Sequence, residues 1–327
     1  MELAFSAEFK TELIFVEKTT DVLKHLPKES FLIVDSCFEN SSWLENFENV
    51  FVFEGELQKD FQHFEVAVEW LTNMKADRNS VVAGIGGGAV TDFAGFLASV
   101  FNRGTRLILV PTTVLSATDS AIGGKTGLNY VAKNILGSFY PAEKVVVATE
   151  FFESLSNDMI LSGKVEMIKV AMLRGGKLAE LVEQGKSLVK RECMEEAIKD
   201  KYFFVRNDLT DRKGTRMYLN WGHTFGHAIE RCYGIPHGMA VATGMILVQK
   251  YMKNMISEVY DPDMLKELFR IHGIELDSGL YLEKKKWLEF IKYDKKREKK
   301  EISMVYLKKK GYPDKIKRSI EEITKDL

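Results

Sequence analysis

The sequence contains few cysteines. Its 327 residues include three, Cys37, Cys193 and Cys232, which lie far apart along the chain. An odd and sparse set is not a disulfide framework, so we expect free thiols and a reducing, cytoplasmic location. The first residues also lack the basic start and long apolar core of a secretory signal peptide, and none is expected.

An excess of either charge is also missing. The chain has 46 Lys and Arg against 47 Asp and Glu, so it has no overall attraction for nucleic acid or for an anionic membrane. Basic residues gather at 284–286 and 295–300, but acidic and apolar residues interleave with them, which is typical of a solvated surface. No apolar run approaches the roughly 18 residues that cross a membrane. Neither nucleic acid nor a membrane is an expected partner.

The first 150 residues alternate short apolar runs with amphipathic stretches. The amphipathic stretches predict helices over 60–74 and 92–101. Alternation of strands and helices is typical of a parallel α/β sheet, and apolar runs with little polar alternation fit a sheet that is covered on both faces. Strands are predicted at 31–35, 49–53, 80–83, 106–110 and 144–148.

From about residue 150, long helical patterns replace the strand-like runs. A late strand is predicted at 301–307, followed by a charged helix at 315–327. We therefore expect an α/β domain with a parallel sheet at 1–150 and a mostly α-helical domain at 151–327. Helices of the second domain are predicted at 158–173, 177–202, 224–232, 239–257, 263–272 and 284–292.

A glycine-rich run, GIGGGA at 84–89, lies between a predicted strand and a predicted helix. It contains a GxGxxA pattern in the strand–turn–helix context that dinucleotide binding requires. Glycines let the backbone approach a pyrophosphate, and the N-terminus of the following helix favours an anion. Asp92 is expected in the first turn of that helix. The alternative is a tight turn that needs positive φ angles.

A second glycine-rich segment places Lys125 after Gly123 and Gly124. The spacing is not that of a Walker A loop, but a lysine among small residues after a strand suits an anionic oxygen. Lys133 and Asn134 follow and could add a charge and an amide to the same ligand. The alternative is an exposed hairpin, because Gly-Gly-Lys-Thr-Gly is also a turn sequence.

Three of the six histidines lie within fifteen residues, at His223, His227 and His237. The first two are four apart, so a helix would carry both on one face. The Gly-Ile-Pro break after Tyr233 would let the chain turn and bring His237 back to them. Such a group can bind a metal or move protons. The alternative is exposed and helix-capping histidines.

A metal site needs a further ligand, and the best candidate is Glu166 in the helical stretch 161–169. Lys169 is three residues away and would share its face. Spacing alone is equally typical of an exposed Glu–Lys pair on the surface.

A polar stripe precedes and includes the histidines. Arg216, Asn220, His223 and His227 are spaced by four, three and four residues, so one continuous helix would align them. Such a stripe is too polar for a core face and favours an anionic, hydroxylated ligand, with the arginine on a phosphate or carboxylate. A hydrated surface stripe is the alternative.

These motifs together resemble the 3-dehydroquinate synthases, a family of the sugar-phosphate cyclase superfamily. The resemblance runs from about Gly84 to His237, and the first ninety residues match it loosely, through Gly55, Glu56 and Lys59. It rests on GGGAVTDFAGF, RGTRLILVPTT, DSAIGGKTGLNYVAKN, SGKVEMIK and NWGHTFGHAIE…HGMAVATGM, in that order.

The resemblance implies an N-terminal dinucleotide-binding α/β domain and a C-terminal helical metal-binding domain. Glu166, His223 and His237 would bind a divalent metal, zinc with cobalt as the alternative, and His227 would handle protons beside it. The substrate pocket would be lined by Asp119, Lys125, Asn134, Lys169, Arg216 and Asn220. NAD would be held by Asp35, Glu56, Lys59, Gly87, Gly88, Asp92, Thr112, Thr113, Lys125 and Lys133.

The implied partner is a phosphorylated acidic sugar. Arg103 would reach its phosphate from a neighbouring subunit, which makes a homodimer the expected assembly, and Lys295 or Lys296 would be a late substrate lysine. The implied reaction converts 3-deoxy-D-arabino-heptulosonate 7-phosphate to 3-dehydroquinate and phosphate, a lyase step of the shikimate pathway to chorismate and the aromatic amino acids. It combines transient NAD-dependent oxidation, phosphate elimination, re-reduction and an intramolecular aldol closure.

Two departures leave other functions open. Met239 stands where the family has Glu after His-Gly. By the resemblance, the segment 208–216 carries one inserted residue, which makes Asp211 the expected acid of that element and Lys201 the expected pocket lysine. A sister cyclase with another sugar phosphate, an NAD- and metal-dependent polyol dehydrogenase, and a non-catalytic binding protein are the alternatives.

Overall fold

The computed structural model describes residues 8–276, 284–294 and 301–326. The chain divides into two compact units, Met1–Leu155 and Ser156–Leu327. Dinucleotide binding by residues 1–150 and metal and substrate binding by residues 151–327 remain predictions.

The first unit is built on a six-stranded parallel sheet. Its strand order is β1-β8-β5-β4-β2-β3, and each neighbouring pair is parallel. The central strands are apolar and buried, as expected for a sheet with two covered faces. The strands are β1 (Glu12–Val16), β2 (Phe31–Asp35), β3 (Val50–Phe53), β4 (Val81–Gly86), β5 (Arg106–Pro111) and β8 (Lys144–Ala148).

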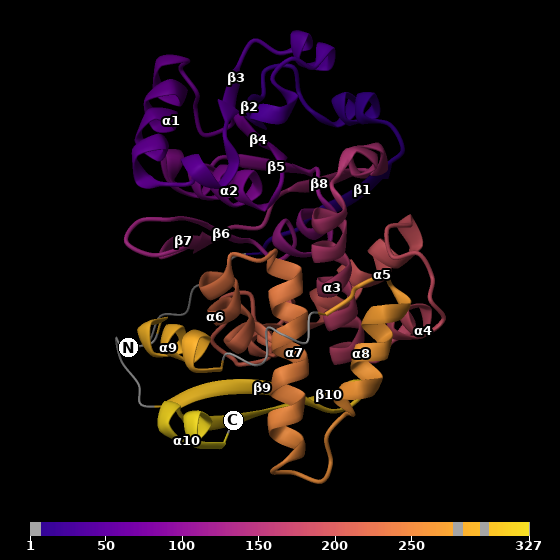
Figure 1. Cartoon of the computed structure of the whole chain (residues 1–327). Coiled ribbons are helices and arrows are strands. Elements are labelled where there is room, and N and C mark those ends of the chain that lie inside the picture. Colours follow the sequence, from indigo (N-terminus) through magenta and orange to yellow (C-terminus); the bar gives the residue numbers. More distant parts are fainter. Residues whose placement is uncertain (1–7, 277–283, 295–300, 327) are drawn as a thin grey trace, which may run out of the picture. The chain divides into compact units, whose positions relative to one another are not determined.

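Two longer helices accompany this sheet, α1 (Phe61–Asn73) and α2 (Gly88–Val100) (Figure 1). Asp60 caps α1 by accepting a hydrogen bond from the His63 backbone N–H at 2.9 Å. A hairpin of β6 (Lys125–Leu128) and β7 (Leu136–Phe139) lies beside α2. Short helical segments complete the unit: η1 (Thr19–His25), η2 (Ser36–Phe38), η3 (Ser42–Asn46), η4 (Gly55–Gln58), η5 (Phe101–Arg103), η6 (Ser116–Ser120) and η7 (Thr149–Ser154).

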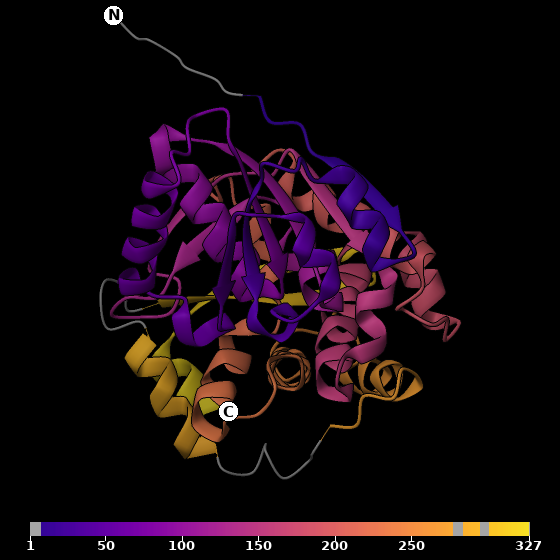
Figure 2. The ribbon, with the colours of Figure 1, turned by 90° about the horizontal axis from the view of Figure 1, so that it is seen from above.

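The second unit is mostly helical. Its long helix α7 lies between α3 and α6, as seen from two directions in Figure 1 and Figure 2. The helices are α3 (Asn157–Arg174), α4 (Lys177–Glu183), α5 (Arg191–Val205), η8 (Arg216–Asn220), α6 (His223–Tyr233), α7 (His237–Lys253), α8 (Pro262–Ile271), α9 (Lys284–Asp294) and α10 (Ile320–Asp326); β9 (Glu301–Lys309) and β10 (Tyr312–Ser319) form an antiparallel pair.

This architecture confirms the predicted fold class, and two predicted elements need correction. The charged helix predicted at 315–327 is wrong in its first part, because residues 312–319 form β10, joined to β9 by a turn in which Gly311 has φ +79°. Its second part is confirmed as α10 (Ile320–Asp326). The single helix at 177–202 is two helices, α4 and α5, separated at Gly185 with φ +66°. The edge strand β1 has no counterpart among the predicted strands.

The cysteines and the helix lengths were also compared with expectation. The three cysteines are free, as expected. Within the described residues, no helix is both long and apolar enough to span a membrane.

Asp200 on α5 is an uncompensated buried acid. It is 7% exposed, and its Oδ2 atom has no hydrogen-bond partner among the described residues. Burial raises its pKa to about 7, although Arg174 acts in the opposite direction. Because the folded state then holds a proton that the unfolded chain releases near pH 4, stability falls as the pH rises from about 4 to 7.

We therefore expect Asp200→Asn to stabilise the protein more at pH 8 than at pH 5, by a difference of about 2 kcal/mol. Thermal unfolding at both pH values measures the difference. Glu192→Gln on the same helix is the control, since Glu192 is exposed and pairs with Lys177 on the surface. A gain that is equal at both pH values would contradict the assignment to a buried charge.

Candidate active site

Three helices of the second unit bring a carboxylate and two imidazoles together. Glu166 lies in the middle of α3 with a side chain that is 2% exposed, while His223 and His237 are the first residues of α6 and α7. Glu166 Oε1 is 3.6 Å from His223 Nε2 and 3.5 Å from His237 Nε2. The predicted return of His237 to the first histidine is confirmed.

The spacing of these three atoms suits a tetrahedral metal. Ligands about 2.0–2.2 Å from a zinc ion are separated from one another by roughly 3.4 Å, which is close to both distances. Within the part of the chain that is described, no well-aligned hydrogen bond reaches either oxygen of Glu166. The buried carboxylate is compensated instead by the charge of Lys169 and by the two imidazoles. One carboxylate and two imidazoles, which would be neutral once the metal displaced any proton on the ligating nitrogen, also leave coordination positions for water or substrate.

Lys169 pairs with Glu166 inside the protein, so the surface Glu–Lys alternative is wrong. Burial raises the pKa of Glu166, but the Lys169 ammonium, followed by His223 and His237, outweighs it and holds that pKa well below the usual range. Burial, aided by Lys169, lowers the pKa of His223 to about 3. His223 is therefore neutral, as a metal ligand must be.

His237 has a different environment. Burial lowers its pKa, but hydrogen bonds to Glu166 and Glu230 outweigh burial and raise the pKa to about 9. Its Nδ1 atom lies 2.9 Å from Glu230 Oε2. Glu230 was not predicted as a site residue from the sequence. The only signal that could have indicated it is its position between His227 and His237.

Glycines allow the helices that carry the histidines to approach closely. A Cβ on Gly244 of α7 would clash with the Gly222 carbonyl oxygen and lie 2.7 Å from the Gly226 nitrogen. Gly222 precedes α6 with φ +82°, a conformation that favours glycine. The backbones of α6 and α7 therefore touch directly, and this contact sets the distance between the helices.

Ser162 connects α3 to the start of α7. Its Oγ accepts a hydrogen bond from the Gly238 backbone N–H at 3.3 Å and donates one to the Asp158 carbonyl. Ser162 is one turn before Glu166 on the same helix face, so one face of α3 holds the beginning of α7 and also presents the carboxylate. A Cβ on Gly238 would clash with Ser162.

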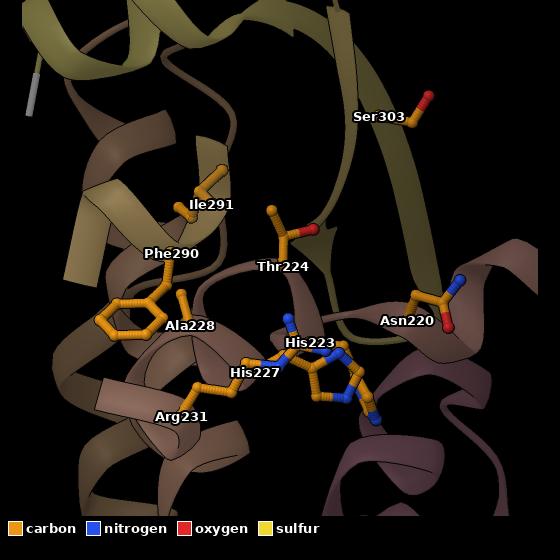
Figure 3. Close-up of a pocket in the computed structure, with 9 residues that line it drawn as sticks. All are labelled: Asn220, His223, Thr224, His227, Ala228, Arg231, Phe290, Ile291 and Ser303. Carbon is orange, nitrogen blue, oxygen red and sulfur yellow. The ribbon is translucent and has the colours of Figure 1, made fainter. Parts of the chain in front are cut away.

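His227 lies next to this group on α6 and faces a cavity of about 210 Å³. Its ring centroid is 5.2 Å from that of His223 and 5.9 Å from that of His237. Figure 3 shows the two α6 histidines side by side, with Arg231 one turn further along the helix. The cavity is lined by Asn220, His223, Thr224, His227, Ala228, Arg231, Phe290, Ile291 and Ser303. An exposed imidazole in such a place can exchange protons with a bound molecule.

The predicted continuous stripe from Arg216 to His227 is wrong. Arg216 and Asn220 belong to the 3-10 helix η8, and the left-handed Gly222 separates it from α6. Asn220 still lines the cavity with His223 and His227. Arg216 is 4% exposed and donates from Nη1 to the Leu209 carbonyl at 3.0 Å.

The loop before Arg216 is organised by Asp208, which sequence patterns did not single out. One carboxylate oxygen accepts from the Arg212 and Lys213 backbone N–H groups at 2.8 Å, and the other accepts from Thr215 and Arg216. These hydrogen bonds, with the one from Lys213 first, hold the pKa of Asp208 far below its ordinary range. The ionised carboxylate thus fixes the backbone of residues 208–216.

In the first unit, the expected dinucleotide residues lie at the carboxyl ends of adjacent strands. Asp35 ends β2, Gly87 and Gly88 follow β4, and Thr112 follows β5. Ligands of open parallel sheets bind at this edge. A Cβ on Gly87 would lie 3.4 Å from Cγ2 of the buried Thr113, so the glycine-rich turn is closely packed on one side.

Lys59 connects the glycine-rich helix to the hairpin loop. Its Nζ donates to Asp92 Oδ2 and to Asn134 Oδ1, both at 2.6 Å, and Lys59 is 2% exposed. Asp92 is not in the first turn as predicted, because α2 begins at Gly88 and its first turn contains no acid. Its carboxylate is instead the partner of a buried lysine.

A second contact holds the same loop. Asn129 donates to Glu56 Oε1 at 2.8 Å and accepts from the Asn134 backbone N–H at 2.9 Å. Asn134 has φ +54°, so its unusual backbone is fixed through the side chain of Asn129. Glu56 and Asn134 were predicted from the sequence as binding residues, and Asn129 was not.

The other predicted residues are more exposed or lie outside the described residues. Lys125 begins β6 and is exposed, as is Lys133 in the hairpin loop. Asp119 is half-buried in η6, and Arg103 is exposed with φ +63°. Lys201 on α5 is 6% exposed. Lys295 and Lys296 fall outside the described part of the chain.

Comparison with known families gives two adjoining matches. The family described as 3-dehydroquinate synthase N-terminal matches residues 49–162, and that described as 3-dehydroquinate synthase C-terminal matches residues 163–297. A 3-dehydroquinate synthase from Methylacidiphilum infernorum is 38% identical over an alignment of 284 residues that covers 84% of this chain and 78% of that protein.

Solved structures of related enzymes share the fold. A 2-deoxy-scyllo-inosose synthase, complexed with carbaglucose-6-phosphate, NAD+ and Co2+, has a TM-score of 0.83 at 22% identity and covers 96% of this chain and 95% of its own. A 2-epi-5-epi-valiolone synthase from Streptomyces hygroscopicus subsp. jinggangensis 5008, with NAD+ and Zn2+ bound, has a TM-score of 0.83 at 19% identity, covering 100% of this chain and 98% of its own.

The close approach of α6 to α7 generates a testable prediction. Gly244→Ala should destabilise the protein by about 2 kcal/mol or more, because the added methyl meets backbone atoms that cannot move alone. Separation of the helices should also weaken divalent-metal binding at least tenfold. Thermal unfolding and competition with a chromophoric chelator measure the two effects.

Gly273→Ala is the control for this substitution. Gly273 also has a positive φ, of +74°, but a Cβ there would meet nothing within 4 Å. Gly273→Ala should lower the free energy of unfolding by about 1 kcal/mol through backbone strain and leave the metal affinity unchanged. Unchanged metal binding in Gly244→Ala would show that the helix contact does not set the ligand geometry.

Proposed function

This chain belongs to the 3-dehydroquinate synthase family, and we propose that it converts 3-deoxy-D-arabino-heptulosonate 7-phosphate to 3-dehydroquinate and phosphate. The observation that carries the proposal is the buried Glu166 with His223 and His237 at metal-ligand spacing. It occurs in a chain whose family matches extend from residue 49 to residue 297. The enzyme class is that of a lyase.

The proposed cofactors are NAD and one divalent ion, zinc with cobalt as the alternative. Glu166, His223 and His237 would hold the ion, and the burial of the carboxylate and the spacing of the three ligand atoms support this. When bound, the ion supplies polarisation of a substrate oxygen, and NAD supplies temporary oxidation of one carbon that is later reversed.

In the first unit, the carboxyl edge of the sheet would bind NAD. Gly87 and Gly88 at the start of α2 suit the pyrophosphate, because their backbone allows close approach at a helix N-terminus. Asp35 at the end of β2 suits ribose hydroxyls. Glu56, Lys59, Asp92, Thr112, Thr113, Lys125 and Lys133 complete the proposed set.

In the second unit, His227 would move the proton of the reacting hydroxyl, since it is exposed to the cavity and adjacent to His223. Asn220 would orient a hydroxyl in the same cavity. Arg216 and Lys169 would counter the negative charge of the substrate, and their burial strengthens that attraction. Asp119, Lys125 and Asn134 are the proposed substrate contacts of the first unit.

The proposed assembly is a homodimer, with Arg103 reaching the phosphate bound by a neighbouring subunit. Arg103 is exposed on a left-handed turn after α2, which supports a role outside its own subunit. The three free cysteines support the proposed cytoplasmic location.

A sister cyclase is the second candidate, because Met239 is half-buried two residues after His237, where the family has an acid. Such an enzyme would use the same ligands with another phosphorylated sugar. A polyol dehydrogenase is less well supported, since the buried Lys169 and Arg216 favour an anionic substrate.

The test is phosphate release from 3-deoxy-D-arabino-heptulosonate 7-phosphate in the presence of NAD and zinc, with the absorbance of reduced cofactor recorded in parallel. We expect phosphate release without net NADH. A chelator should abolish it, and His227→Ala should slow it about 100-fold or more. His25→Ala, in the first unit, is the control and should retain full activity.

Absence of phosphate release, with NAD and metal still bound, would exclude this substrate and favour a sister cyclase. Accumulation of NADH in proportion to product would instead identify a dehydrogenase.

A further inference from the structure

Glu230 is the remaining acid beside the proposed metal ligands. It lies on α6, and its Oε2 atom is 2.9 Å from Nδ1 of His237 on α7. The side chains are 25% and 29% exposed, respectively. The contact therefore joins two helices in a partly desolvated place, where a charge-assisted hydrogen bond is strong.

This contact determines which nitrogen of His237 carries the proton. An ionised carboxylate only accepts hydrogen bonds, so Nδ1 must donate. In the neutral ring the lone pair then belongs to Nε2, the atom that lies 3.5 Å from Glu166 Oε1. Glu230 thus selects the tautomer in which Nε2 can bind a metal.

The other histidine ligand is oriented in a similar way by the backbone. His223 Nδ1 lies 3.2 Å from the Trp221 carbonyl oxygen, which can only accept. Its Nε2 atom is then also left facing Glu166. The difference is that the partner of His237 is a charged side chain, and substitution can remove it.

Distances argue against Glu230 as a ligand in its own right. His227, Glu230 and His237 also form a group that could hold a metal ion. Two ligands of one tetrahedral ion lie about 3.4 Å apart, as Glu166 and the two histidines do. The 2.9 Å between Glu230 and His237 is instead the length of a charge-assisted hydrogen bond.

We propose that Glu230 is a positioning residue, which orients His237 by accepting from Nδ1 and so presents Nε2 to the metal. This rests on the metal site of the proposed function. Loss of the acceptor frees the ring to rotate and to take the other tautomer, so the apparent metal affinity falls while Glu166, His223 and His237 all remain.

The experiment compares Glu230→Ala and Glu230→Gln with the unaltered full-length chain. Each protein is stripped with a chelator, and the zinc dissociation constant is measured by competition with a chromophoric chelator. Glu230→Ala should bind zinc 10- to 100-fold more weakly. Glu230→Gln should lose less, because its amide oxygen can still accept from Nδ1. Glu267→Gln, an exposed acid paired with Arg270 on α8, is the control and should be unchanged.

A second measurement distinguishes a change in the orientation of His237 from a loss of the folded structure. The visible spectrum of the cobalt-substituted protein reports the ligand set, so it should change in Glu230→Ala and return towards the original form in Glu230→Gln. Thermal unfolding of the stripped proteins checks folding. If Glu230→Ala does not fold, Glu230→Gln decides: the inference requires that it bind zinc measurably more weakly than the unaltered chain, because a neutral amide is a weaker acceptor than a carboxylate.

Two results would overturn the inference. One is an unchanged zinc affinity and cobalt spectrum in the folded variants. The other is binding of two ions by the unaltered chain and of one by Glu230→Ala, which would make Glu230 a ligand. If the unaltered chain binds one ion tightly but releases no phosphate from 3-deoxy-D-arabino-heptulosonate 7-phosphate, the proposed function fails while the role of Glu230 stands.

Discussion

The second unit depends on the burial of one negative charge. Glu166 lies in the middle of a buried helix, and removal of a carboxylate from water is costly unless opposite charges or hydrogen bonds replace the solvent. Lys169 supplies one positive charge on the same helix. The remaining compensation comes from residues far away in the sequence, at the starts of α6 and α7. Folding and metal binding therefore share one requirement, which is that three helices meet at this carboxylate.

The positions of the histidines at helix starts add a second effect. The N-terminus of a helix carries partial positive charge and unpaired backbone N–H groups, and neither α6 nor α7 has a side-chain cap from its own N-cap residue. Two such ends near Glu166 stabilise its ionised form. For α7, Ser162 accepts from one of the free N–H groups. A metal cation would otherwise be repelled by these helix ends, so the carboxylate is what makes a cation site possible there.

The sequence predicted the parts of this arrangement that depend on local spacing. The parallel sheet, the spacing of His223 and His227 and the return of His237 follow from apolar runs, helical periodicity and a Gly-Pro break. Spacing could not decide whether Glu166 and Lys169 face solvent or core, because a helix presents the same pair either way. The prediction of one continuous helical stripe from Arg216 to His227 was wrong, because Gly222 takes a left-handed conformation between two helices. Asp208, Glu230 and Asn129 act through tertiary contacts that have no periodic signal.

The resemblance to the family implies one inserted residue before Arg216, so this loop is the place where the position of that arginine could have changed. Asp208 accepts from the backbone of residues on both sides of Gly214, including Arg216 itself. Asp211 and Gly214 adopt positive φ angles of +57° and +85°, which let the longer loop fold back on the carboxylate. Arg216 is further held through its guanidinium by the Leu209 carbonyl. Because the start and the end of the loop are fixed by one ionised side chain, the extra residue changes the path between them and leaves Arg216 anchored. This supports retention of an anionic substrate.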